Sequence, residues 1–212
     1  MKERYPVPAR EVRHEIMVVN SRFIATLAPA FSVEQAKDFV RRMRAEFADA
    51  SHNVSAYVVG FGSSVTAHCN DDGEPAGTAG RPALAVLQGS GLGDAAVVVT
   101  RYFGGTRLGT GGLVRAYSDA VRQVLAIIPR AYKIPVHTVM LGLPYSLFEQ
   151  ARLLIAAQGG MLLDQDFAAE VTLTARFPVE RLEAFQAALS ELSNGALKAE
   201  IVETSEALVA VE

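Results

Sequence analysis

The chain has 212 residues, of which 50% are hydrophobic, a formal net charge of −3 at pH 7 and one cysteine. This length allows one or two domains with full hydrophobic cores. Cys69 has no cysteine partner, which excludes an internal disulfide, and the longest apolar runs are far shorter than the roughly 20 residues of a membrane span. The first residues are charged and lack the apolar core of a signal peptide, so we expect a cytoplasmic protein without membrane contact.

Charge is distributed unevenly along the chain. Residues 1–133 carry 16 Lys and Arg against 12 Asp and Glu, whereas residues 134–212 carry 4 against 11. A basic half followed by an acidic half argues against a protein that coats nucleic acid along its whole length. A local patch in the first half could still attract phosphate groups.

The first half of the sequence predicts strands and helices in alternation. Alternating apolar residues near positions 16–18 and 23–27 predict two short strands that turn at Asn20-Ser21. Ser32 is a good N-cap for an amphipathic helix at 33–47. The other elements expected here are strands at 54–61, 64–68 and 95–100, a helix at 79–89 capped by Thr78, and a helix from Thr110 onward.

A second domain is predicted after the segment between Pro129 and Pro135, which we interpret as a linker. We therefore expect domains at 1–132 and 133–212. The second has the pattern βαββαβ, which is typical of a ferredoxin-like fold with two helices on one face of an antiparallel sheet, so the fold class is α+β. Its expected strands are 136–143, 161–165, 171–177 and 197–203, and its expected helices are 145–158 and 179–193.

A glycine-rich loop between the buried strand and the last helix of the first domain is the best candidate anion site. Glycines let backbone N–H groups point inward, the helix N-terminus adds partial positive charge, and arginines can bind phosphate in a bidentate way. The spacing matches neither a dinucleotide fingerprint nor a P-loop. The alternative is that the glycines only allow a tight turn. The candidate phosphate- or nucleic-acid-binding residues are Arg101, Tyr102, Gly104, Gly105, Arg107, Gly109, Gly111, Gly112 and Arg115.

Carboxylates precede this loop and are expected to organise the site. Asp71, Asp72 and Glu74 could bind a cation or act in acid/base chemistry. We favour the structural alternative, in which they cap the helix that begins near Thr78 or pair with Arg81, Arg101 or Arg115. His52 is the best single acid/base candidate, because histidine is the residue type that most often serves in this role. His52, Asp72 and Glu74 are thus weak catalytic candidates, and no residue is assigned a catalytic role. We expect no metal and no cofactor, because His68-Cys69 lacks a second ligand pair at zinc spacing.

Four segments of the first domain closely resemble the IMPACT family, in its bacterial YigZ-like branch. They are 71–82 (DDGEPAGTAGRP), 99–118 (VTRYFGGTRLGTGGLVRAYS), 21–25 (SRFIA), and His52-Asn53 with Ala56-Tyr57. The resemblance implies a ribosomal-protein-S5-domain-2-like fold, a sheet with helices on one side, for the first domain. For the second it implies a ferredoxin-like domain similar to C-terminal domains of elongation factor G.

The function implied by this resemblance is a contact with RNA or with the ribosome. Eukaryotic members dampen a starvation-responsive kinase of translation initiation, largely through an additional RWD domain, and we do not expect that role here. We expect a non-enzymatic protein that binds RNA or a ribosome-associated partner and regulates translation or a stress response. Two alternatives stay open: an enzyme acting on a phosphorylated small molecule or nucleotide, and an interaction module that docks through its acidic C-terminal domain.

Overall fold

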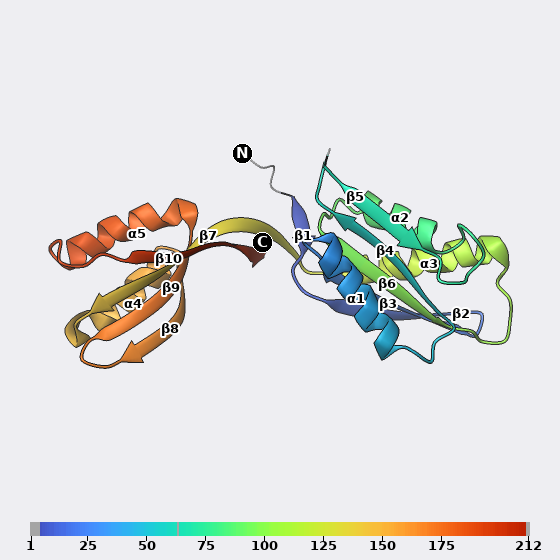
Figure 1. Cartoon of the computed structure of the whole chain (residues 1–212), viewed down its shortest axis with the longest axis horizontal. Coiled ribbons are helices and arrows are strands. Elements are labelled where there is room, and N and C mark those ends of the chain that lie inside the picture. Colours follow the sequence, from blue (N-terminus) through green and yellow to red (C-terminus); the bar gives the residue numbers. More distant parts are fainter. Residues whose placement is uncertain (1–4, 63, 211–212) are drawn as a thin grey trace. The chain divides into compact units, whose positions relative to one another are not determined.

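The computed structural model describes residues 5–62 and 64–210. The chain divides into two compact units. One contains the chain up to Tyr132 together with its end from Leu208, and the other is Lys133–Ala207. The architecture mixes helices with antiparallel sheets, so the α+β class is confirmed (Figure 1).

The first unit is built on a five-stranded sheet with the order β2-β3-β6-β4-β5, in which every neighbouring pair is antiparallel. The predicted helices at 33–47, at 79–89 and from residue 110 are present as α1, α2 and α3. The elements are β2 (Val12–Val18), β3 (Ser21–Pro29), α1 (Val33–Glu46), β4 (His52–Val59), β5 (Thr66–Asn70), α2 (Gly80–Gly89), β6 (Ala95–Tyr102) and α3 (Gly109–Ile127).

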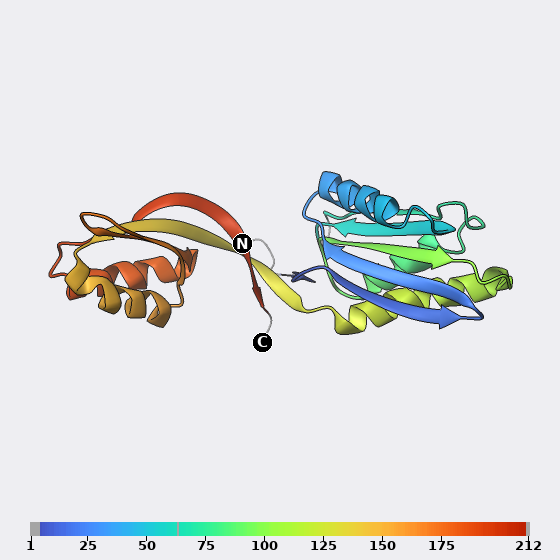
Figure 2. The same cartoon turned by 90° about the horizontal axis from the view of Figure 1, so that it is seen from below.

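Helices cover both faces of this sheet, so the expectation of helices on one side is wrong (Figure 2). Successive residues of a strand point to opposite faces. In β6, Val97 and Val99 pack in the core shared with α2 and α3, whereas Ala96 and Val98 pack against α1. β6 is therefore apolar on both faces, which explains its uninterrupted apolar run.

Two local expectations for the first unit are wrong. Thr78 does not cap α2: its hydroxyl donates to the carbonyl of Pro75, and the Asp71 carboxylate accepts from the first N–H groups of the helix instead. The segment expected to be a linker is also ordered as strand. β7 (Arg130–Leu143) starts there and pairs antiparallel with β1 (Pro6–Pro8), a partner too distant in sequence for a local pattern to reveal.

The second unit has the element order predicted from the sequence. Its sheet has the order β8-β9-β7, with β10 also paired to β7. Both α-helices lie on one face of the sheet (Figure 2). Their side chains pack against it, with Phe177 of β9 stacked on Phe185 of α5. The elements are β7, a short 3-10 turn η1 (Tyr145–Leu147), α4 (Phe148–Ala157), β8 (Met161–Phe167), β9 (Val171–Pro178), α5 (Val179–Leu192) and β10 (Glu200–Ala210).

Candidate functional site

A buried ion pair lies at the end of β6, where the strand meets the loop before α2. The guanidinium of Arg101 donates to Glu74 at 2.6 Å, and both side chains are at most 6% exposed. Tyr117 of α3 donates its hydroxyl to the same carboxylate oxygen at 2.8 Å. Burial, together with the Glu74 carboxylate, raises the pKa of Tyr117 far above its ordinary value, so the phenol stays a neutral donor.

His52 and Asp72 extend this cluster across β4. The backbone carbonyl of Asp72 lies 2.8 Å from Nδ1 of His52, and since a carbonyl only accepts, Nδ1 carries the proton. Nε2 then faces Glu74 at 3.9 Å. The Asp72 carboxylate accepts from the backbone of Asn53 and forms an ion pair with Arg44 of α1.

The three carboxylates of the loop therefore point to three different partners. Asp71 accepts from the backbone N–H groups of Gly77, Ala79 and Gly80, at 2.7–3.1 Å. Burial opposes its ionisation, but these three donors and the charge of Arg81 outweigh burial and lower the pKa of Asp71. Asp71, Asp72 and Glu74 do not converge on one point, and among residues 5–62 and 64–210 no group of three His, Cys, Asp or Glu side chains is placed to hold a metal ion.

A pocket of about 270 Å³ opens beside the ion pair at the N-terminus of α3. The first N–H groups of α3 have no intrahelical acceptors, as at the start of any helix, and Leu108 at the N-cap offers them no side-chain acceptor. Phe103 lines the pocket and is 49% exposed, with its ring 5.5 Å from the Arg101 guanidinium carbon. The lining residues include Glu74, Arg101, Phe103, Arg107, Gly109 and Thr110.

The structure separates the predicted phosphate-binding residues into different environments. Arg101 is buried against Glu74, whereas Arg107 is exposed and no contact between described residues uses its guanidinium. Arg115 is exposed and donates to the carbonyl of Gly111 in its own helix. Tyr102 lies outside the pocket lining, because the residue after Arg101 in a strand points to the other face, where its hydroxyl donates to Asp49.

The glycines of the loop also differ in role. Gly104 is required by close packing, because a Cβ there would lie 2.0 Å from the carbonyl oxygen of Asn20. Gly105 and Gly109 have positive φ angles of 86° and 69°, which glycine adopts without strain. Gly111 and Gly112 belong to the first turn of α3. Some of the glycines are therefore needed for the turn itself, as expected if they have a structural role.

Ser21, Arg44 and Tyr117 take part in the cluster but were not singled out as site residues from the sequence. The Ser21 hydroxyl lies 3.3 Å from a guanidinium nitrogen of Arg101 and 3.2 Å from the Gly104 nitrogen, so it connects the ion pair to the loop. Ser21 and Tyr117 lie inside the segments that carry the family resemblance. Arg44 lies on an amphipathic helix, where its spacing predicts only a solvated face.

Most charges of the cluster are thus neutralised within the protein. The groups without a partner among the described residues are the Arg107 guanidinium and the first N–H groups of α3, and both favour a negatively charged ligand. The fold and this site define a class of two-unit α+β proteins that carry a glycine-rich loop over a buried Arg–Glu pair. No helix among the described residues is long and apolar enough to cross a membrane.

Comparison with known proteins identifies the family. The Impact N-terminal domain matches residues 19–125, and a domain of unknown function, DUF1949, matches residues 141–196. The chain is 40% identical to the IMPACT family member YigZ of Escherichia coli over 92% of its own length and 97% of the relative. The protein therefore belongs to the IMPACT family, and similarity over nearly the whole of both chains fits the YigZ-like branch.

Two further similarities span most of the chain. An IMPACT family member of Haemophilus influenzae is 38% identical over 95% of this chain and 98% of the relative. A crystal structure of a hypothetical protein is 39% identical, covers 96% of this chain and 99% of that one, and superimposes with a TM-score of 0.62. Both units are thus present, in the same order, in relatives of this protein.

Proposed function

We propose that the protein binds RNA or a ribosome-associated partner through the pocket at the N-terminus of α3, where the contact is made to a phosphate or another anionic group. The observation that carries this proposal is the exposed Arg107 guanidinium beside an uncapped helix N-terminus in one pocket. Both groups favour anions, and neither is neutralised by the nearby carboxylates, which bind Arg101, Arg44 and the start of α2.

The proposed contact is non-catalytic, and its role is the regulation of translation or of a stress response in the cytoplasm. Membership in the IMPACT family supports this role, because the family resemblance implies it. The finer fold assignment belongs to the same proposal. The first unit is ribosomal-protein-S5-domain-2-like in its sheet and in the face covered by α2 and α3, with α1 covering the other face. The second unit is ferredoxin-like, similar to C-terminal domains of elongation factor G, and the strand order β8-β9-β7-β10 supports this second assignment.

The pocket proposal is tested by the salt dependence of RNA binding. Arg107→Ala is expected to weaken binding to all sequences about equally and to reduce the slope of log affinity against log salt by about 0.7–1, since one phosphate contact is lost. Arg10→Ala is the matched control, because Arg10 is an exposed arginine of the same unit outside the pocket. An unchanged salt slope for Arg107→Ala, with RNA binding intact, contradicts the proposed site.

A phosphorylated small molecule is the second candidate ligand of this pocket. The pocket volume of about 270 Å³ is close to the lower end of the range for small-molecule sites. Nε2 of His52 faces Glu74, which lines the pocket. Catalysis would require a proton transfer by His52, Asp72 or Glu74. Incubation with nucleotides and Mg²⁺ that gives neither turnover nor thermal stabilisation would remove this candidate.

A further inference from the structure

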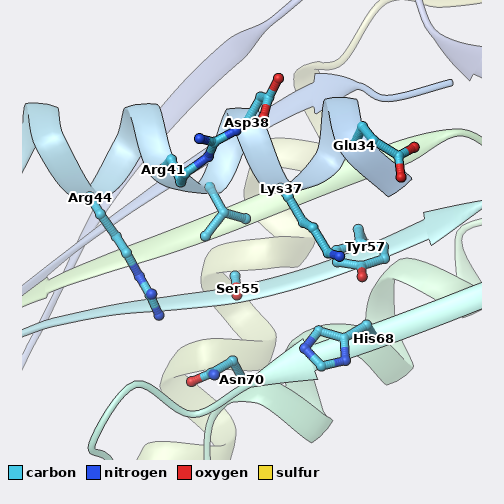
Figure 3. Close-up of a pocket in the computed structure, with 10 residues that line it drawn as sticks. Glu34, Lys37, Asp38, Arg41, Arg44, Ser55, Tyr57, His68 and Asn70 are labelled. Carbon is cyan, nitrogen blue, oxygen red and sulfur yellow. Dashed lines mark hydrogen bonds and ion pairs between the residues drawn. The ribbon is translucent and has the colours of Figure 1, made fainter. Parts of the chain in front are cut away.

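A second, larger pocket lies on the opposite face of the first unit's sheet. This groove, of about 620 Å³, runs between α1 and the two strands β4 and β5 (Figure 3). Its floor is formed by Ser55 and Tyr57 of β4, and one wall by His68 and Asn70 of β5. We call it the α1 groove. Its volume lies within the range of small-molecule sites.

Most hydrogen-bond donors that line the α1 groove make no hydrogen bond to another described residue. No contact between described residues uses the Lys37 ammonium or the hydroxyls of Ser55 and Tyr57. Asn70 accepts from the backbone of Asp72 through its Oδ1, which leaves its NH₂ group as a donor. Several donors that line one groove favour a ligand rich in acceptors.

Positive charge enters the groove from the helix. Figure 3 shows Lys37 and Arg44 extending from α1 toward the strands. Arg44 contacts Asp72 through one nitrogen, so its other N–H groups remain available. Of the two acidic residues of the lining, Asp38 is neutralised by Arg41, and Glu34 lies toward the N-terminal end of the helix.

An aromatic platform lies opposite these cations. His68 is exposed, and its ring is backed by the buried ring of Tyr57, with centroids 5.4 Å apart. An exposed flat ring on a strand is a surface on which nucleobases stack. The register of the sheet, Tyr57 opposite His68, keeps the two rings together.

The shape and polarity of the α1 groove argue against two other occupants. A partner helix would need a continuous apolar floor, whereas every lining residue of this groove except Val40 carries a polar or charged group. A peptide strand added to β5 would lie beyond the edge of the sheet and would not fill a space above β4 and β5.

We propose that the α1 groove binds a nucleotide, with the base stacked on His68 and the phosphate held by Lys37 and Arg44. The nucleotide could be free or could be one unit of a single strand, since both present the same ring and phosphate. This site is independent of the pocket at the N-terminus of α3, because the two open on opposite faces of the sheet.

The test is a titration of the full chain with 5′-AMP, adenosine, ribose 5-phosphate and a short oligoadenylate, followed by NMR. Lys37→Gln and His68→Ala are each expected to weaken binding of 5′-AMP by about tenfold, since each removes one charge-assisted or stacking contact. Both side chains are exposed, so the fold should be retained. Lys198→Gln, an exposed lysine outside the groove, is the matched control and should bind as the unchanged protein does.

The titration identifies the source of the nucleotide and tests whether the α1 groove binds it. Tighter binding of oligoadenylate, lost in the same two variants, identifies a single strand as the source, whereas a preference for 5′-AMP identifies the free nucleotide. Absence of saturable binding at millimolar concentration overturns the proposal, as does ribose 5-phosphate binding as tightly as 5′-AMP. Loss of 5′-AMP binding in Arg107→Ala, with binding retained in Lys37→Gln and His68→Ala, would place the nucleotide in the α3 pocket and overturn the proposal for the α1 groove. Failure of this site and failure of the α3 pocket are therefore distinguishable.

Discussion

At the scale of single residues, the Arg101–Glu74 pair determines what the candidate site can do. Both charges are removed from water, and each is stabilised mainly by the other. The ion pair is held further by the Tyr117 hydroxyl, and Ser21 lies next to Arg101. Arg101 therefore has a structural role in holding the loop in place, whereas the exposed Arg107 is the cation that an external anion can reach.

Glu74→Gln is expected to lower the free energy of unfolding by about 3–5 kcal/mol, because it leaves the Arg101 charge buried without a counter-charge. The measurement is urea unfolding at neutral pH. The double variant with Arg101→Met removes both charges and should cost less than Glu74→Gln alone. Arg122→Ala, which breaks an exposed pair with Asp119, is the control and should change stability by less than about 1 kcal/mol. A similar small effect for Glu74→Gln would contradict a tightly buried pair.

At the scale of elements, the start of α2 shows where sequence reasoning reached its limit. The helix and its position were predictable from the apolar spacing after residue 79, and so was a role for the carboxylates in capping or ion pairing. The capping residue was not, because Asp71 lies nine positions before Gly80, and a loop with positive φ at Asp72, Gly73 and Gly77 returns it to the helix. Local patterns identify a cap only when it precedes the helix directly.

Asp71→Ala is expected to lower the free energy of unfolding by about 1–2 kcal/mol at pH 7, because three N–H groups lose their acceptor. The pKa of Asp71 is lowered in the folded state, so this stabilisation is present above its ordinary value of 3.8 and is lost as the pH falls through the lowered pKa. Unfolding measured from pH 7 to pH 2.5 should show the two proteins converging in acid. Thr78→Ala is the control, and a larger loss for it than for Asp71→Ala would contradict the assigned cap.

The candidate site was predictable only in part, for a related reason. The glycine-rich loop and the carboxylate segment are contiguous in sequence, so their composition marked them directly. Which arginine is buried and which is exposed depends on the direction in which each side chain points in the fold and on the residue that lies opposite it. The sequence predicts that these carboxylates pair with Arg101 or another arginine of the segment, but not which carboxylate does so. Arg101 meets Glu74 across 27 positions and Arg44 meets Asp72 across 28, and only the fold fixes these particular partners.

At the scale of the whole molecule, the hydrophobic cores of the two units are built from different parts of the chain. The cores of the first unit involve α1, α2 and α3, whereas the core of the second involves α4 and α5. We expect two calorimetric transitions, each sensitive to its own core. Phe185→Ala should destabilise only the second unit, and Leu87→Ala only the first, by about 3–5 kcal/mol each, since both side chains are fully buried. If either substitution shifts both transitions by the same amount, the units unfold as one, and β7, whose residues belong to both units, couples them.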